Sequence, residues 1–93
     1  MLEIRAMQAE DLEAVVRTES QIFSRPWSRK GFEDALRQKE TIYLVAYEKD
    51  ILAGYCGLLQ SFDEADITNV AVVEKFRKKG VATELLEQLF LRG

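Results

Sequence analysis

The amino-acid sequence predicts an α/β (α+β) fold with a mixed, mainly antiparallel sheet and the element order β-α-α-β-β-β-α. Three observations carry this prediction. Residues 2–7 alternate apolar and polar side chains, as in a strand with one buried face. Two stretches of helical period follow, and three β-rich runs separated by short polar turns come after them. Residues 81–91 then show the apolar spacing of an amphipathic helix.

Length and composition narrow the class of protein. With 93 residues, the chain is expected to form a single domain, residues 1–93, with a thin core. A net charge of −3 disfavours nucleic acid as the main partner. The sequence has no histidine, which excludes Ser-His-Asp triads, Cys-His pairs and His-based zinc sites, and no metal is expected. The charged N-terminus does not resemble a signal peptide, and no apolar run approaches ~18 residues, so we expect a cytoplasmic protein without a membrane segment.

The first helix is predicted over residues 11–23. Its apolar residues recur with helical period and fall on one face: Leu12, Val15, Val16, Ile22 and Phe23. No strong N-cap precedes this helix, and Asp11 is expected to favour its first turn through the helix dipole.

A loop separates this helix from the next one. Pro26 disfavours helical backbone at the residue before it, and Ser28 is a good N-cap for the second helix. Trp27 and Phe32 have the spacing of a hydrophobic staple, which would fix how the loop enters that helix. The alternative makes Arg25, Pro26, Trp27 and Ser28 part of a substrate groove, although the pattern favours the staple.

Residues 41–47 and 51–62 predict an antiparallel hairpin around a polar turn. Gly54 and Gly57 interrupt the second run and predict a bulge, or the close approach of another backbone or a ligand. Residues 63 and 64 are expected to turn the chain into the strand 65–73.

Four side chains within these runs could in principle carry chemistry. Cys56 lies in an apolar run and is expected to be a small buried hydrophobe rather than a nucleophile. Tyr43, Tyr47 and Tyr55 fall in predicted strands and are expected to pack in the sheet.

A basic turn joins the last predicted strand to the last helix. The first N–H groups of a helix lack partners within it, and the helix dipole makes this end partly positive. Arg77, Lys78 and Lys79 add positive charge, and Gly80 allows a positive φ, so the turn suits a phosphate. A solvated basic turn that merely starts a helix is equally compatible with the turn alone. The spacings of a Walker loop and of a dinucleotide fingerprint are both absent.

The wider sequence around this turn favours a ligand. The run from Arg77 to Ala82, R-K-K-G-V-A, resembles the Arg/Gln-x-x-Gly-x-Gly/Ala signature of the GNAT superfamily of acetyl-CoA-dependent N-acetyltransferases. The strand N-V-A-V at residues 69–72 lies upstream, and a helix follows. The Pro-Trp-Ser piece resembles the RimI-like ribosomal-protein-alanine acetyltransferases. The resemblance covers essentially the whole chain, but only the N-terminal half to two thirds of such a domain, so the chain is expected to be truncated before the C-terminal strands.

The resemblance implies a function and a set of site residues. The pantetheine arm of acetyl-CoA would pair with the backbone of the strand at residues 70–72, and the basic turn would wrap the pyrophosphate. The loop 25–28 would line the acceptor side, where the amine of a protein N-terminus, such as that of a ribosomal protein, attacks the thioester directly. The implied cofactor-binding residues are Val70, Ala71, Val72, Arg77, Lys78, Lys79, Gly80, Val81, Ala82 and Thr83.

The catalytic groups are less defined. In RimI-like proteins the glutamate base and the tyrosine acid lie after the signature helix, and this sequence ends before both. Asp66 is the one base candidate within these residues, although an exposed carboxylate at the start of a strand is the favoured interpretation. No catalytic acid is assigned.

Several alternatives remain open from the sequence. With no strand beyond it, the edge of residues 65–73 is expected to be unpaired and apolar, and to form a homodimer or bind a partner. The acceptor could instead be a small amine. The chain could also be a non-catalytic CoA-binding or interaction module, or a fragment that binds no ligand.

Overall fold

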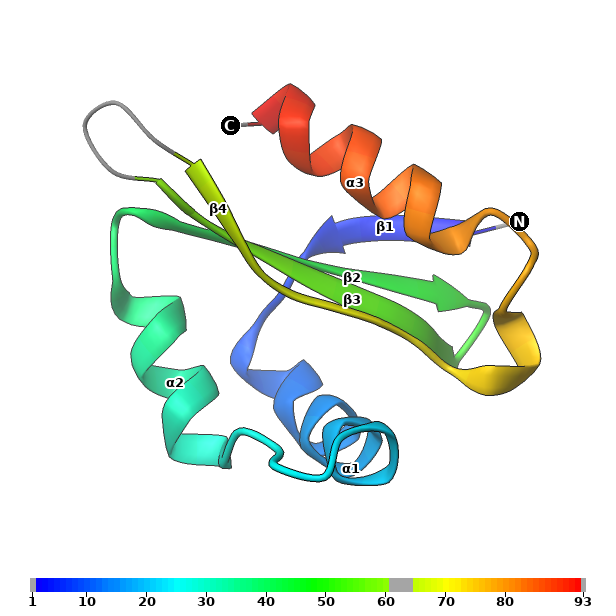
Figure 1. Ribbon diagram of the computed structural model, residues 1–93, viewed down its shortest axis with the longest axis horizontal. Coiled ribbons are helices and arrows are strands. Elements are labelled where there is room, and N and C mark those ends of the chain that lie inside the picture. Colours follow the sequence, from blue (N-terminus) through cyan, green and yellow to red (C-terminus); the bar gives the residue numbers. More distant parts are fainter. Residues whose placement is uncertain (1, 61–64, 93) are drawn as a thin grey trace.

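The computed structural model describes residues 2–60 and 65–92, and it confirms the predicted fold class (Figure 1). Four strands form one sheet in the order β1-β2-β3-β4, and each described pair is antiparallel. The strands are β1 (Leu2–Ala6), β2 (Thr41–Glu48), β3 (Ile51–Gln60) and β4 (Ala65–Val72). The turn predicted at residues 63 and 64 lies outside the described residues.

The helices cover both faces of this sheet. In Figure 1, α1 and α2 lie below the sheet and α3 lies above it. The helical elements are the 3-10 turn η1 (Ala9–Asp11), α1 (Leu12–Ile22), α2 (Arg29–Arg37), the 3-10 turn η2 (Glu74–Phe76) and α3 (Val81–Arg92). Each predicted helix is therefore present, with the first beginning one residue later than expected.

Two hydrophobic clusters hold the three layers together. The cluster between the sheet and the helices α1 and α2 is rich in aromatic rings, including Phe32, Tyr43 and Tyr55. The cluster between the sheet and α3 is mainly aliphatic and contains Cys56, which is fully buried. Burial raises the pKa of the Cys56 thiol to about 12, so the thiol stays protonated at neutral pH. The prediction that Cys56 is a small buried hydrophobe is confirmed.

The glycines of β3 lie where other groups come close. A Cβ on Gly54 would lie 2.6 Å from the carbonyl oxygen of Ala71, so this position confirms the predicted close approach of another backbone. The ring of Tyr43 covers Gly57 and occupies the space of any side chain there. The register of β2 with β3 skips Ala53, next to Gly54, so β3 contains the predicted bulge. A second shift beside Gly57 leaves Thr68 as an extra residue in β4.

The start of α1 differs from the prediction. Asp11 lies in η1 rather than in α1, and its carboxylate accepts a hydrogen bond of 2.7 Å from the Gln8 N–H. The same carboxylate accepts two bonds of 2.7 and 2.8 Å from the Arg5 guanidinium and one of 3.0 Å from the Tyr47 hydroxyl. The expected dipole effect alone is therefore an incomplete account of Asp11. Its main role is to tie β1, η1 and β2 together.

This cluster predicts a pH-dependent stability. Burial alone would raise the pKa of Asp11, but the hydrogen bonds from Arg5, Gln8 and Tyr47 outweigh burial and lower it below the ordinary value of 3.8. The stabilisation is therefore complete above that pH and is lost as pH falls through the folded-state pKa. We expect Asp11→Asn to lower the free energy of unfolding by about 1 to 2 kcal/mol at pH 7, measured by urea denaturation.

Below pH 4 the difference between this variant and the natural sequence should shrink toward zero. Glu13→Gln serves as the control, since Glu13 is exposed and its 3.4 Å pair with Arg17 is a surface pair. A difference for Asp11→Asn that persists unchanged in acid would show that its charge is not what stabilises the cluster.

Candidate functional site

The predicted phosphate turn forms a shaped loop between β4 and α3. Gly80 has a φ of 80°, as the sequence predicted. Lys78 also has a positive φ, 64°, which the sequence did not indicate because lysine rarely adopts this conformation. The Nε of Arg77 donates a hydrogen bond of 3.1 Å to the Val72 carbonyl, which fixes the turn to the end of β4. Local backbone conformation, the backbone hydrogen bonds of η2 and this side-chain contact therefore set the shape of the turn.

A hollow of about 250 Å³ opens at this turn, in front of the first turn of α3. Most of the predicted pyrophosphate residues line it, together with Phe76 and with Val72 of the predicted pantetheine strand. The lining residues of the turn are Arg77, Lys78, Gly80, Val81, Ala82 and Thr83. The helix N-terminus and the nearby cations make it a suitable anion site.

Lys79 departs from the predicted arrangement. It does not line this hollow, and its ammonium group lies over the Phe76 ring, 5.9 Å from the centroid. Lys79 instead lines a neighbouring hollow with Leu2 and Glu84. Its positive charge is close enough to contribute to the field of the turn, but the structure does not place it among the lining residues.

The predicted pantetheine strand lies at the edge of the described sheet. Ala71 is buried and pairs with Tyr55 across to β3, and Val72 pairs with Gly54. In the described sheet β4 is the last strand, so its second edge has no strand neighbour there. Ile67 on this strand is 43% exposed. The pairing of this edge with a second copy of the chain stays a prediction.

The predicted acceptor loop is anchored to the aromatic cluster. The Ser28 hydroxyl accepts a hydrogen bond of 3.1 Å from the Gly31 N–H, which confirms the predicted cap of α2. The rings of Trp27 and Phe32 lie 5.2 Å apart, which confirms the staple. Trp27 also lies 6.3 Å from the ring of Tyr43, while Arg25 and Pro26 are exposed.

Tyr43 connects this cluster to the bulge in β4. Its hydroxyl lies 2.9 Å from the Thr68 hydroxyl and donates to the Asn69 side-chain oxygen at 3.2 Å. Burial raises the pKa of Tyr43, so its hydroxyl stays protonated at neutral pH. Tyr43, Tyr47 and Tyr55 all lie in strands, as predicted. The sequence did not indicate their hydrogen bonds, because the partners lie on other elements.

The sequence singled out one carboxylate, Asp66, and did not single out another, Glu19. Asp66 is exposed on β4, in agreement with the favoured interpretation, and its role as a base stays untested. Glu19 was missed, although it is 2% exposed and bonded both to Tyr55 and to the backbone of Trp27. A signal for it exists in the sequence, because Glu19 lies four residues after Val15 on the apolar face of α1.

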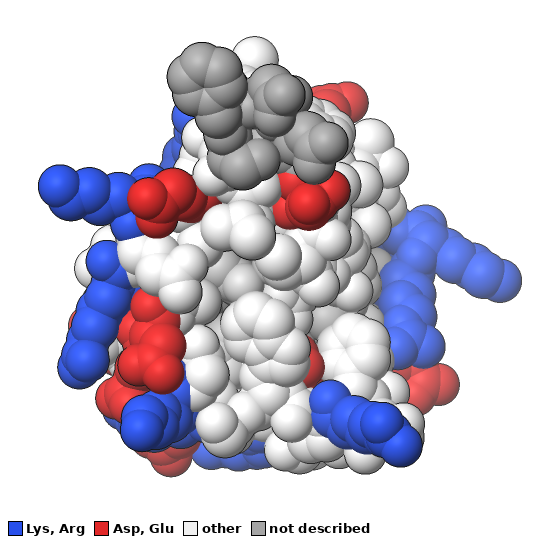
Figure 2. Space-filling view, turned by 60° about the vertical axis from the view of Figure 1, so that its left-hand side comes forward, with Lys and Arg blue, Asp and Glu red and all other residues white. Residues whose placement is uncertain are grey.

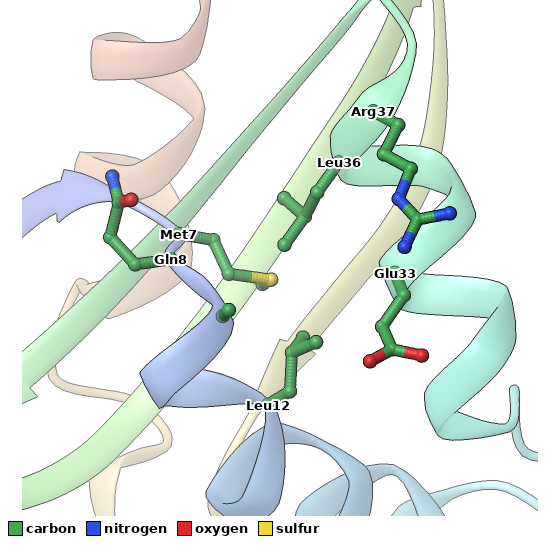
Figure 3. Close-up of a pocket in the computed structure, with 7 residues that line it drawn as sticks. Met7, Gln8, Leu12, Glu33, Leu36 and Arg37 are labelled. Carbon is green, nitrogen blue, oxygen red and sulfur yellow. The ribbon is translucent and has the colours of Figure 1, made fainter.

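The surface and a third hollow help to delimit the site. Figure 2 shows a largely uncharged strip down the middle of one face, with both basic and acidic side chains on its flanks. A separate pocket of about 390 Å³ lies between η1 and α2, where Met7, Leu12 and Leu36 form its apolar part (Figure 3). Glu33 and Arg37 lie at the α2 side of this pocket. None of the predicted cofactor residues lines it.

Residues 2–60 and 65–92 show neither a cluster of metal ligands nor a membrane-spanning helix. Within these ranges, histidine, cysteine and carboxylate side chains nowhere gather in threes as a metal site requires. No helix in the same part of the chain has the length and apolarity needed to cross a membrane.

The chain matches known proteins over nearly its full length. Residues 8–90 match the acetyltransferase (GNAT) family. A protein of Bacillus subtilis (strain 168) that is named as a ribosomal protein bS18-alanine N-acetyltransferase is 34% identical over 83 residues, which cover 88% of this chain and 55% of that protein.

Solved structures agree with this match. The ribosomal-protein-S18-alanine N-acetyltransferase from Escherichia coli has a TM-score of 0.84 and 26% identity, over 96% of this chain and 57% of that one. The PaiA N-acetyltransferase from Thermoplasma acidophilum, solved in complex with coenzyme A, has the same fold, with a TM-score of 0.84 at 18% identity over 96% of this chain and 69% of that one. The chain thus spans little more than half the length of the first two relatives.

Proposed function

Because this chain belongs to the GNAT acetyltransferase family, we propose that it transfers the acetyl group of acetyl-CoA to the N-terminal alanine amine of a ribosomal protein. The observation that carries the proposal is the turn from Arg77 to Thr83. Gly80 has a positive φ there, and the turn lines a hollow at the start of α3. The relative named for alanine acetylation, 34% identical, supports the choice of acceptor. The cytoplasm, which supplies both ribosomal proteins and acetyl-CoA, is the expected compartment.

The residues of the turn would bind the pyrophosphate mainly through backbone N–H groups. Gly80 and Val81 present the first N–H groups of α3, and Arg77 and Lys78 add positive charge beside them. The free edge of β4 at Val70, Ala71 and Val72 would pair with the amide groups of pantetheine, as an added strand does. Together these two elements would direct the thioester along β4 toward the loop that carries Trp27.

The chemistry follows from the reacting groups. Acetyl-CoA supplies an activated thioester. The neutral amine attacks the thioester carbonyl carbon, the new C–N bond forms, the C–S bond breaks, and the proton lost by the amine balances the one gained by the thiolate. The described residues would contribute binding and orientation to this step. Asp66 stays a candidate base only, and no described residue is assigned as the acid.

The proposal is tested by incubating the chain with acetyl-CoA and two peptides of the same sequence, each with one internal lysine. One peptide has a free N-terminal alanine, and the other has the same residue blocked. We expect mass spectrometry to show one acetyl group on the α-amine of the first peptide and none on the second. Acetylation of the lysine in both peptides, or transfer to a polyamine instead, would overturn the proposed acceptor. Failure of acetyl-CoA to bind would overturn the proposed cofactor site.

A further inference from the structure

Glu19 is a buried carboxylate that the proposed binding of acetyl-CoA does not use. It lies near the end of α1 and is 2% exposed, whereas carboxylates are rarely buried to this extent. The Tyr55 hydroxyl donates a hydrogen bond of 2.5 Å to Glu19 Oε1, and the Trp27 backbone N–H donates one of 3.1 Å to Oε2. Both donors are neutral, so each carboxylate oxygen accepts a hydrogen bond from an uncharged group and these two contacts are not ion pairs.

The two donors belong to opposite sides of the candidate site. Trp27 lies in the loop before α2, on the proposed acceptor side. Tyr55 is fully buried in β3 and pairs directly with Ala71, on the proposed pantetheine strand. Burial and the Glu19 carboxylate raise the pKa of Tyr55, so its hydroxyl remains a donor throughout the pH range of an ordinary assay. Glu19 therefore links the loop backbone to the strand pair through hydrogen bonds, beside the ring contact of Trp27 with Tyr43.

We infer that Glu19 is a positioning residue. Its two hydrogen bonds fix the position of the loop at Trp27 relative to β3 and β4, and the fixed loop orients the acceptor amine toward the thioester. This inference rests on the proposed function, which assigns Trp27 to the acceptor side and β4 to the pantetheine side. The two hydrogen bonds of Glu19 do not depend on that function. A carboxylate suits this task because each of its two oxygens accepts from a different element. Glutamine has one acceptor oxygen, so it would keep one of the two bonds in the same form.

The first experiment measures the link without any ligand. Hydrogen exchange by NMR follows the Trp27 amide, and acrylamide quenching follows its indole, which is the one tryptophan of the sequence. In Glu19→Ala we expect the protection of the Trp27 amide to fall about tenfold or more, since a hydrogen bond to a charged acceptor is lost. Quenching should increase, and Glu19→Gln should give smaller changes of the same sign.

Two variants serve as controls for this measurement. Glu13→Ala makes the same chemical change on the same helix at a side chain that is 81% exposed, so Trp27 should not change. Tyr55→Phe removes the bond from β3 but leaves the bond to Trp27, and it should have an effect no larger than that of Glu19→Gln. If the Ala variant does not fold by circular dichroism, the Gln variant decides. Unchanged exchange at Trp27 in Glu19→Gln and, where folded, Glu19→Ala would overturn the proposed link.

The second experiment asks whether the link matters for the acceptor. The probes are CoA and a bisubstrate in which CoA is joined to an alanyl peptide, both titrated by calorimetry. In Glu19→Ala we expect the affinity advantage of the bisubstrate over CoA to fall about tenfold, with CoA affinity unchanged. An equal loss for both probes, or no loss for either, would overturn the positioning role.

The failure of this inference is distinguishable from the failure of the proposed function. If the natural sequence binds neither probe, the proposed cofactor site is wrong and the positioning role is overturned with it, while the exchange data still decide the link. If the natural sequence binds both probes and the Glu19 variants behave as it does, the proposed function stands and Glu19 has only a packing role.

Discussion

Gly80→Glu is expected to abolish acetyl-CoA binding while leaving the fold intact. No heavy atom lies within 4 Å of a Cβ placed at this residue, so the new side chain has space. The φ of 80° costs a residue other than glycine about 1 kcal/mol. A carboxylate beside the pyrophosphate adds a repulsion of about 2 to 4 kcal/mol, which together with the strain should weaken binding at least about 100-fold. Calorimetric titration with acetyl-CoA measures this loss.

Gly80→Gln is the matched control, because it has the same size and the same backbone strain without the charge. We expect it to bind acetyl-CoA more tightly than Gly80→Glu but less tightly than the natural sequence. Acetyl-pantetheine, which lacks the pyrophosphate, should bind all three chains alike. If Gly80→Glu bound acetyl-CoA as well as the natural sequence does, the phosphates would have to lie elsewhere.

Gly54→Ala is expected to have the largest effect on stability. The added Cβ would lie 2.6 Å from the Ala71 carbonyl oxygen and 3.3 Å from the Val72 Cα, so β3 and β4 would have to separate. Neither of these atoms belongs to a flexible side chain, and overpacking against backbone costs about 2 to 3 kcal/mol. We expect the melting temperature to fall by about 10 to 20 °C, measured by circular dichroism.

The control for this change is Gly31→Ala in α2. There the nearest atoms lie 3.6 and 3.8 Å from the added Cβ, at ordinary contact distances, and alanine favours a helix over glycine by up to about 1 kcal/mol. This variant should be as stable as the natural sequence or slightly more stable. Equal losses of stability in both variants would show that the approach of β4 to Gly54 is not the cause.

Most of the fold could be predicted because its signals are local. The period of apolar residues identifies α1 and α3. Pro26 places the loop before α2, and Ser28 marks the start of that helix as its N-cap. The basic turn is also a local motif, since a glycine, its cations and a helix start are adjacent in sequence. Its position and the positive φ of Gly80 could therefore be predicted, while its binding of phosphate stays a proposal.

What the sequence could not predict depends on contacts between distant elements. Asp11 looked like a dipole residue, but Arg5 and Tyr47 reach it from two strands. The position of Glu19 on the apolar face of α1 indicates that it is buried, but not that Tyr55 and Trp27 approach it from β3 and the loop. No pattern along one segment reports a partner on another segment, so buried polar networks are the part that the structure adds.

The order of the strands also has a consequence for how the chain folds. β2 pairs with β3 and β3 pairs with β4, so this meander can form by closing short loops between strands that follow one another in the sequence. β1 pairs with β2 only after a segment containing both α1 and α2 has been closed, as in the register of Leu2 with Glu48. Contacts of longer sequence separation form more slowly. We therefore expect the meander and α3 to assemble first, and the aromatic cluster, with Glu19 inside it, to be completed last.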